Sequence, residues 1–510
     1  MEKGISGKIA KAFLESKLTV LLMIAFMLVG IFSSYLIPRE EEPQIEVPMA
    51  DVFLRYPGAT PKEVETKIAA PLEKIISNLP GVEHIYSTSM SGQAMIIVQF
   101  YVKEDIERSF VQLYNEILKH MDQMPQGVSM PLIKTRAVDD VPMQSLTFWS
   151  ETYNDFEIKQ LAEEVNNQLK SIKGIAATKI IGGRSREISV VLDKDKMAQN
   201  HVDILGITQK INANNQQSQV GHYNANDTEI LVNAGNFLKS VDDVNNLIIG
   251  VYQQKPVYLK QVATVKDGAE IPNEYVSFGY GKADDKNKAD FKSEYAAVTL
   301  SISKQKGGDA MKLADKINSK IALLKKSLIP NDIHVSVTRN YGQTASDKVS
   351  ELLMHLMIAI IAVTLLVMLA MGWRGALVVF LSIPVTFALT LFSYYFMDYT
   401  LNRITLFALV FVTGIVVDDS IIIAENMHRH FKSKRLPFKQ AAIFAINEVG
   451  NPTILATFTV VASILPMAFV SGLMGPYMSP MPIGASIAMV FSLLVALTIT
   501  PYLGLKFLQA

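Results

Sequence analysis

The apolar residues of this chain gather at its two ends and leave a long, ordinary polar stretch between them. The segment from Leu18 to Ile37 carries no charge and, at about 1.5 Å per residue, is long enough to cross a hydrocarbon core roughly 30 Å thick. Five further apolar spans follow the polar stretch, at approximately 350–371, 375–397, 403–426, 452–471 and 483–505. We therefore predict an α-helical membrane bundle of six spans with a large external domain inserted after the first.

The first span has one alternative interpretation, a cleavable signal peptide. Its apolar run is long for the core of a signal peptide, and the IPREEEP that follows offers no small-residue cleavage site. We therefore interpret residues 1–37 as an N-terminal tail and a first membrane span.

The charge balance and the missing cysteines exclude several classes of function. The chain has 48 basic and 48 acidic side chains, so it lacks the basic excess typical of nucleic-acid-binding proteins, and we expect no nucleic-acid partner. It has no cysteine, which excludes a disulfide scaffold, a thiol nucleophile and any cysteine-ligated metal site. No glycine-rich nucleotide motif and no HExxH zinc motif occurs, so no motif indicates an enzyme.

Basic residues at the ends of the spans orient the bundle, because short cytoplasmic loops carry the basic excess. The tail before the first span and the loop after the fourth span are both basic, through Lys3, Lys8, Lys11 and Lys17 in the tail and Arg429, Lys432, Lys434 and Arg435 in the loop. We predict that the N-terminus lies inside, that residues of roughly 38–344 lie outside, and that the lipid bilayer surrounds the bundle.

A short segment between the fourth and fifth spans has a helical pattern of its own. Residues 436–447, LPFKQAAIFAIN, start with a leucine-proline pair and have apolar residues at helical spacing. The pattern predicts an amphipathic helix on the inner membrane surface, and a simple linker is the alternative.

The external insert shows the same order of elements twice. Its first part predicts β-α-β-β-α, with a helix that starts at Thr60 and Pro61. The order returns with the strand MQSLTFWS, a helix over 155–172, the strands ATKIIGG and REISVVLD, and a helix near 203–217. We interpret the insert as an α+β domain duplicated from ferredoxin-like β-α-β-β-α-β units, and chance agreement of two common patterns is the alternative.

An Asn- and Gln-rich stretch follows the second unit. NANNQQSQVGHYNANDTEILVNAGNF is too polar to build a core, which is typical of disorder. Because the strand-like EILVNAG follows directly, we favour an extended hairpin that projects from the domain.

Two adjacent carboxylates, Asp418 and Asp419, lie near the middle of the fourth span. An ionised carboxylate at the centre of a span costs on the order of 3 kcal/mol, so the pair needs a partner, a proton or water. Like charges this close do not ionise together without a cation, and no Lys or Arg of these six spans lies at a similar depth. We predict that the pair takes up and releases protons. The alternative is two neutral residues that form hydrogen bonds at a helix contact.

Other residues near this pair are weaker candidates. Gly414, one turn before Asp418, favours close helix packing at the site, and a random small residue is the alternative. Glu425 at the inner end of the span is a candidate for a proton path, with a boundary residue as the alternative. Glu351, one turn before His355 of the second span, is another candidate, and the alternative there is a histidine whose hydrogen bonds are satisfied at a helix contact. The 23 methionines suit soft metal ions, but most lie in the spans as packing residues, and we predict no metal site.

Several stretches together resemble the resistance-nodulation-division efflux permeases, in particular the hydrophobe/amphiphile or acriflavine-resistance branch. The matching stretches are GIVVDDSIIIAEN with both aspartates, YPGATPKEVE, LPGVEHIYSTS, GWRGALV, PMAF and LVALTITP. They extend over the whole chain but over only the amino-terminal half of the family's pattern.

The resemblance implies a secondary active transporter of the bacterial inner membrane, not an enzyme. Proton uptake at Asp418 and Asp419 would drive export of hydrophobic or amphiphilic compounds, with the proton motive force and no cofactor. Family members work as homotrimers with a periplasmic adaptor protein and an outer-membrane channel. The counter-cation is a lysine of the carboxy-terminal half, so either this chain is a piece of a longer protein or it is one partner of a split transporter.

The resemblance also divides the chain into named parts. After the tail and first span, these are porter subdomain 1 (38–140), porter subdomain 2 in two parts (141–184 and 274–340), a docking-type subdomain with a protruding hairpin (185–273), and the second to sixth spans (341–510). The family's pocket phenylalanines are not matched by VPMQSLTF and ATKIIGG, so no substrate-binding residue is predicted. A membrane-anchored periplasmic binding or sensory module and a metal-ion exporter remain alternative functions.

Overall fold

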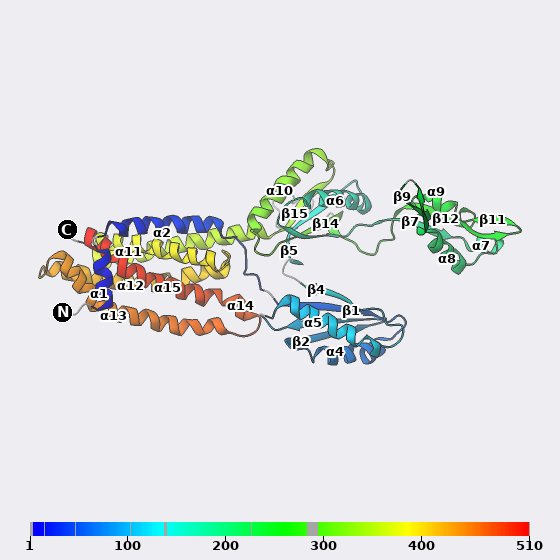
Figure 1. Ribbon diagram of the computed structural model, residues 1–510. Coiled ribbons are helices and arrows are strands. Elements are labelled where there is room, and N and C mark those ends of the chain that lie inside the picture. Colours follow the sequence, from blue (N-terminus) through cyan, green and yellow to red (C-terminus); the bar gives the residue numbers. More distant parts are fainter. Residues whose placement is uncertain are drawn as a thin grey trace.

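The computed structural model describes residues 4–14, 16–45, 47–102, 104–136, 140–225, 227–282 and 294–508. Lys3, which contributes to the predicted orientation, lies outside these residues. The molecule is elongated, with a helical bundle at one end, two sheet units beside each other in the middle, and a third small region at the far end (Figure 1).

Among the described residues, five helices are long and apolar enough to cross a membrane. Their cores are α2 (Lys17–Leu36), α11 (Tyr341–Phe396), α12 (Arg403–Ser433), α13 (Phe438–Ile464) and α15 (Pro480–Phe507). The 56 residues of α11 include Gly372 at φ 79° and ψ 173°, a backbone conformation that glycine adopts without steric cost. The predicted spans 350–371 and 375–397 lie on the two sides of this break.

The prediction of a separate surface helix over residues 436–447 is wrong, because α13 runs without interruption from Phe438 to Ile464. Pro452, where the fifth span was predicted to begin, lies inside this helix. A proline removes one backbone hydrogen bond, and packing of the helix against its neighbours offsets that loss. Ala441, Ala442 and Ala445 are buried against the bundle, so the segment is a packed helix end.

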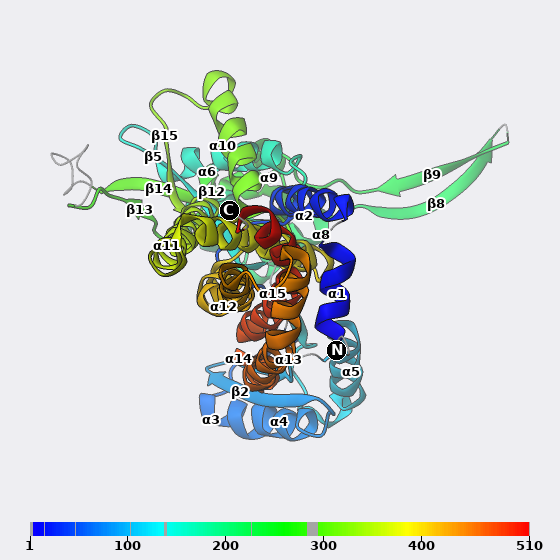
Figure 2. The same cartoon turned by 90° about the vertical axis from the view of Figure 1, so that its left-hand side faces the viewer.

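A short helix, α1 (Ile5–Phe13), precedes the first span and runs across the axis of the bundle (Figures 1 and 2). It packs on α13, where the backbone N–H of Gly4 donates to Oδ1 of Asn447 at 2.8 Å. Gly450 allows this contact, because an added Cβ would lie 2.2 Å from Oγ of Ser6. Figure 1 shows that the N- and C-terminal ends of the described chain both lie at the end of the bundle opposite the sheet units.

The first sheet unit has four antiparallel strands in the order β2-β3-β1-β4. Its elements are β1 (Met49–Arg55), α3 (Pro61–Val64), the π-helix Glu65–Ala69, α4 (Ala70–Ile76), β2 (Val82–Met90), β3 (Gln93–Phe100), α5 (Ile106–Lys119), the 3-10 helix Met121–Gln123 and β4 (Leu132–Arg136). The predicted cap is present, since Thr60 and Glu63 form a capping box, and the Thr60 backbone N–H holds the pKa of Glu63 below its ordinary value.

The second sheet unit has five strands, and its chain path differs from the one that the repeated pattern predicts. Its elements are β5 (Pro142–Ser150), α6 (Asp155–Leu169), β6 (Ile175–Ile181), β13 (Ser277–Phe278), β14 (Tyr295–Lys304), α10 (Ala310–Ser327) and β15 (His334–Asn340). β14 lies between β6 and β5, and β15 flanks β5. The predicted third strand, REISVVLD, is β7 (Arg186–Leu192), which pairs with β12 (Ala263–Ala269) outside this sheet. Gly182 and Gly183, both at positive φ, follow β6 where the chain leaves the sheet.

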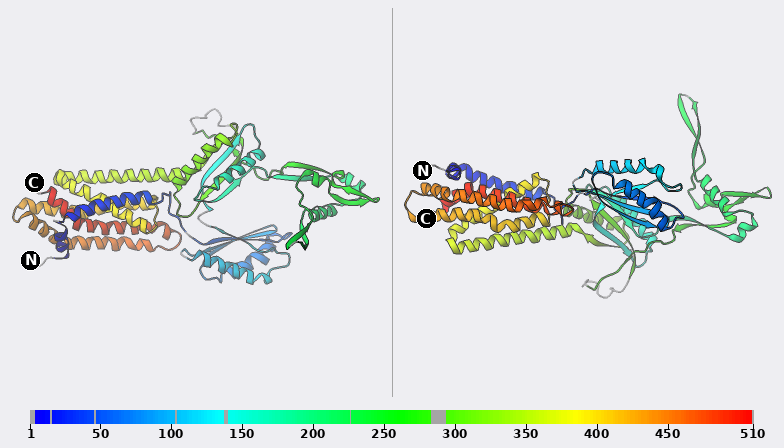
Figure 3. Two further views of the ribbon diagram at one scale, coloured as in Figure 1. Left: turned by 45° about the horizontal axis from the view of Figure 1, so that its top comes forward. Right: turned by 90° about the horizontal axis from the view of Figure 1, so that it is seen from below.

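The far region consists of small helices and two-stranded sheets. Besides β7 and β12 it contains α7 (Lys194–Gln199), α8 (Ile204–Asn214), β8 (Ser218–Ala225), β9 (Thr228–Ala234), α9 (Val241–Asn245), β10 (Ile248–Tyr252), β11 (Lys255–Tyr258) and the 3-10 helix Leu259–Gln261. Strands β8 and β9 pair only with each other and form the hairpin expected from the Asn/Gln-rich stretch. The hairpin extends far to the side of the molecule (Figures 2 and 3).

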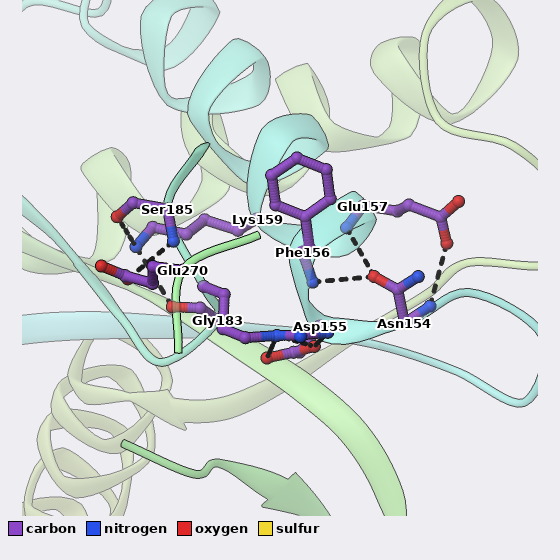
Figure 4. Close-up of polar contacts among 9 residues, drawn as sticks. Asn154, Asp155, Phe156, Glu157, Lys159, Gly183, Ser185 and Glu270 are labelled. Atoms are coloured by element: carbon purple, nitrogen blue, oxygen red, sulfur yellow. Dashed lines mark hydrogen bonds and ion pairs between the residues drawn. The ribbon is translucent and has the colours of Figure 1, made fainter. Parts of the chain in front are cut away.

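A polar cluster joins this far region to the second sheet unit, and we call it the joint (Figure 4). Arg184 makes a bidentate ion pair with Asp155 in the first turn of α6, with N–O distances of 2.7 to 3.0 Å. Lys159 donates to the Gly183 carbonyl at 3.1 Å and to the Ser185 hydroxyl at 2.8 Å. The Ser185 backbone N–H donates to Glu270 at 2.7 Å and holds the pKa of that carboxyl below its ordinary value.

Candidate functional site

The two predicted aspartates lie on α12, which packs against α11, α13 and α15. Adjacent positions on an α-helix differ by about 100°, so the two carboxylates point in different directions. Asp419 is 7% exposed and faces α13 and α15, whereas Asp418 is exposed. The pair is therefore one buried site and one surface site.

Two hydroxyl groups from different helices hold the Asp419 carboxylate. Thr457 of α13 donates to Oδ1 at 3.2 Å, and Ser492 of α15 donates to Oδ2 at 3.0 Å. Each hydroxyl also lies within hydrogen-bond distance of a backbone carbonyl, that of Thr453 for Thr457 and that of Val416 for Ser492. A hydroxyl has one proton to donate, so each must choose between the carboxylate and its carbonyl.

A separate row of buried hydroxyl groups lies between α11, α12 and α15 and includes Ser420, the residue after Asp419. The Thr500 hydroxyl lies 3.2 Å from that of Ser420 and 3.0 Å from that of Ser382. All three residues are at most 4% exposed. Sequence reasoning missed this row and both partners of Asp419. The signal was the set of Ser and Thr residues within apolar spans, but their spacing along the chain does not show which of them meet.

The opposite face of α12 is uncovered along its length. Phe407 and Phe411 are each 47% exposed, and Gly414, Asp418 and Glu425 are also exposed. An added Cβ at Gly414 would meet no atom within 4 Å. The predicted role of Gly414 in close packing is therefore not fulfilled by any described part of this chain.

The candidates for a proton path lie apart from the aspartates. Glu351 forms an ion pair with Lys348 at 2.8 Å on the exposed side of α11. Glu425 is exposed in the C-terminal third of α12, whereas its neighbour Asn426 is buried and donates to the carbonyl of Ala445 at 2.8 Å. None of the described hydrogen bonds links Glu351 or Glu425 to Asp418 or Asp419.

The two aspartates have no cationic partner among the described residues. Within the described ranges, neither aspartate forms an ion pair with a Lys, Arg or His side chain, and no group of three or more His, Asp and Glu residues could hold a metal ion. A carboxylate held by hydroxyl groups in an apolar bundle can accept a proton without breaking an ion pair. The arrangement suits reversible proton binding.

The fold and this site define a membrane protein in which a helical bundle carries a sheet-rich domain. The family model for the AcrB/AcrD/AcrF family matches residues 9–510. The chain belongs to this family, as the GIVVDDSIIIAEN motif predicts.

The curated relatives are multidrug resistance proteins. Multidrug resistance protein MdtC of Yersinia pestis bv. Antiqua (strain Angola) is 27% identical over 486 residues, which cover 95% of this chain and 46% of the relative. The same identity and coverage are found for MdtC of Yersinia pseudotuberculosis serotype O:1b (strain IP 31758). This chain therefore spans about half the length of the curated relatives it matches.

Proposed function

We propose that this chain is the amino-terminal half of a proton-coupled efflux transporter of the bacterial inner membrane, which exports hydrophobic or amphiphilic compounds. The observation that carries the proposal is the Asp419 carboxylate, buried between three helices and held by two hydroxyl groups without a cation. The proton motive force drives the transporter, and no cofactor takes part. The multidrug names of the relatives support the class of substrate.

The choice of acceptor at each hydroxyl supplies a mechanism. When Asp419 is ionised, Thr457 and Ser492 donate to it and tie α12 to α13 and α15. When Asp419 is protonated, the oxygen that carries the proton becomes a donor, and the hydroxyl beside it turns to its own carbonyl, that of Thr453 or Val416, while the other oxygen can still accept. Each proton therefore changes a contact of α12 with a neighbouring helix, as a transport cycle requires.

A buried ion pair connects these helices with the external domain. Glu40, which follows α2, is 3% exposed and pairs with Lys304 at the end of β14. Its second oxygen accepts from the Thr400 hydroxyl at 3.1 Å, just before α12 begins at Arg403. In our proposal, movement of α12 reaches the second sheet unit through Glu40.

The uncovered face of α12 is where we place the missing partner. A carboxy-terminal half would pack on Gly414, where no described part of this chain fills the space, and bring a cation to Asp418. The two arms of α11 would then count as separate spans, which gives six spans in total, with the N-terminus in the cytoplasm. We interpret the two sheet units as ferredoxin-like porter subdomains and the far region as a docking subdomain in the periplasm.

We infer the assembly state and the partner proteins from the family to which the chain belongs. We expect a homotrimer that works with a periplasmic adaptor protein and an outer-membrane channel. The β8–β9 hairpin, isolated from every other sheet, would contact a neighbouring subunit.

Co-expression tests this proposal. The chain is expressed with a carboxy-terminal half in cells that lack other pumps, and the accumulation of an amphiphilic dye is measured. We expect low accumulation with both halves and high accumulation with either half alone. Asp419→Asn should raise dye accumulation, whereas the control Asp332→Asn, in the external domain, should leave it unchanged. Unchanged dye levels across a broad compound panel, with both halves assembled, would contradict drug export, and a ligand response that survives Asp419→Asn would favour a sensory module.

A further inference from the structure

An apolar groove runs between α2 and α15 on the side of the bundle away from the open face of α12. It consists of two neighbouring cavities of about 510 and 460 Å³, which share Phe26 of α2 and Leu494 of α15. The first cavity is closed at one end by Ile9 and Phe13 of α1. The second continues toward the external end of the bundle, where Phe396 and Met397 line it.

The lining of the first cavity offers no free polar group. Its two hydroxyls are those of Thr19 and Thr498. Thr19 donates to the Phe13 carbonyl at 2.7 Å, and Thr498 donates to the Leu494 carbonyl at 2.6 Å. A ligand in this cavity must therefore be apolar along its length.

The size of the groove indicates the kind of occupant. Cavities of about 510 and 460 Å³ fall within the range of roughly 300–1,000 Å³ that small ligands occupy. A narrow apolar chain that lies along a membrane span fits both the size and the setting.

Basic side chains lie on α1 and α15 beyond the end of the groove that α1 closes. Lys8 and Lys11 lie on the exposed side of α1, the helix whose Ile9 and Phe13 close the cavity. Lys506 lies seven residues after Ile499 on α15, two helical turns further along the same face. Among the described residues, none of these three lysines forms an ion pair, and Lys506 stands 5.0 Å from the centre of the Tyr502 ring.

We propose that this groove binds an anionic phospholipid, with an acyl chain between α2 and α15 and the phosphate near Lys8, Lys11 and Lys506. The apolar lining takes the chain, and the lysines at its inner end attract the negative headgroup. The helix α1 is thus a lipid-binding element that lies in the membrane interface. The site is independent of Asp419 and of the proposed transport.

The test uses the full chain, purified from membranes in a mild detergent and studied by native mass spectrometry. The probes are dioleoyl phosphatidylglycerol, which is anionic, and dioleoyl phosphatidylcholine, which is zwitterionic. We expect tighter binding of the anionic lipid. The variant K8Q/K11Q should bind it about 25-fold more weakly, since each basic residue near an anionic surface contributes about fivefold. Its control, K325Q/K326Q, removes two exposed charges from α10 and should change nothing.

A second variant tests the groove itself. Leu494→Trp places a large ring at the position that the two cavities share and should weaken binding of both lipids, whereas Leu455→Trp on the exposed side of α13 should not. Equal binding of both lipids, or no effect of K8Q/K11Q, would overturn the proposal. A change in oligomeric state with Leu494→Trp at unchanged lipid binding would show that the groove is a protein contact instead.

Discussion

The bundle and the joint both contain carboxylates in polar clusters, but the clusters differ in what holds the charge. At the joint, Arg184 pairs with Asp155, and next to it Arg186 of β7 pairs with Asp267 of β12. In the bundle, only hydroxyl groups hold Asp419. A carboxylate with an arginine keeps its charge at ordinary pH, whereas one with hydroxyl partners can exchange a proton at little cost in contacts. The comparison separates a structural cluster from one suited to transport.

The largest effect is expected from removing the exchangeable proton. Asp419→Asn keeps the size of the side chain but cannot ionise, so transport by the two co-expressed halves should fall by about a hundredfold or more. Dye efflux from loaded cells measures it. At the joint, Asp155→Asn should leave efflux within about twofold. Equal losses for the two variants would remove the distinction between the clusters.

The next largest effect is expected at the open face of α12, where we propose that the carboxy-terminal half binds. Gly414→Leu fills the open face of α12, so it should prevent assembly with the carboxy-terminal half, while this chain alone still folds. Co-purification of the two halves measures assembly. The matched variant Ala424→Leu, on the buried face, should instead destabilise the chain itself by about 1–3 kcal/mol. Normal assembly of Gly414→Leu would argue against our placement of the second half.

A smaller effect follows from removing one hydroxyl. Ser492→Ala takes away one hydrogen bond to a charged group, worth about 1.5–3 kcal/mol, so the efflux rate should fall by about tenfold or more. Ser463→Ala is the control, since its hydroxyl bonds only to the Val460 carbonyl on the exposed side of α13. Unchanged efflux in Ser492→Ala would contradict the role of the hydroxyls at Asp419.

The smallest effects belong to the joint. Arg184→Ala removes a partly exposed ion pair at the surface, which typically contributes about 0.2–1 kcal/mol, and thermal unfolding should show a correspondingly small loss of stability. A loss of efflux as large as that of Asp419→Asn would show that the joint takes part in transport.

The stability that the Arg186–Asp267 ion pair contributes should not change between pH 5 and 8. Arg186 holds the pKa of Asp267 below its ordinary value of 3.8. The ion pair's contribution to stability is therefore fully present above pH 3.8 and is lost only as the pH falls through the lowered pKa of Asp267. Hydrogen exchange in β7 and β12 between pH 5 and 8, corrected for the intrinsic rate, should be constant. A transition in this range would contradict the ion pair.

Much of the bundle was predictable, because a membrane span must be long, apolar and helical. The same constraint made Asp418 and Asp419 visible, since charges are costly there. The β8–β9 hairpin was predictable from its polar composition and the strand that follows it. The continuity of α13 through Pro452 was not, because a proline ends a helix in one setting and is tolerated by packing in another.

The amino-acid sequence by itself determined where apolar segments can cross a membrane, which residues carry charge inside it, and the family. Only the tertiary structure decided that Asp419 is buried and Asp418 exposed, and that Thr457 and Ser492 meet at one carboxylate. The reason is physical: hydrophobicity and charge belong to single residues, whereas burial and hydrogen bonding depend on which distant segments pack together.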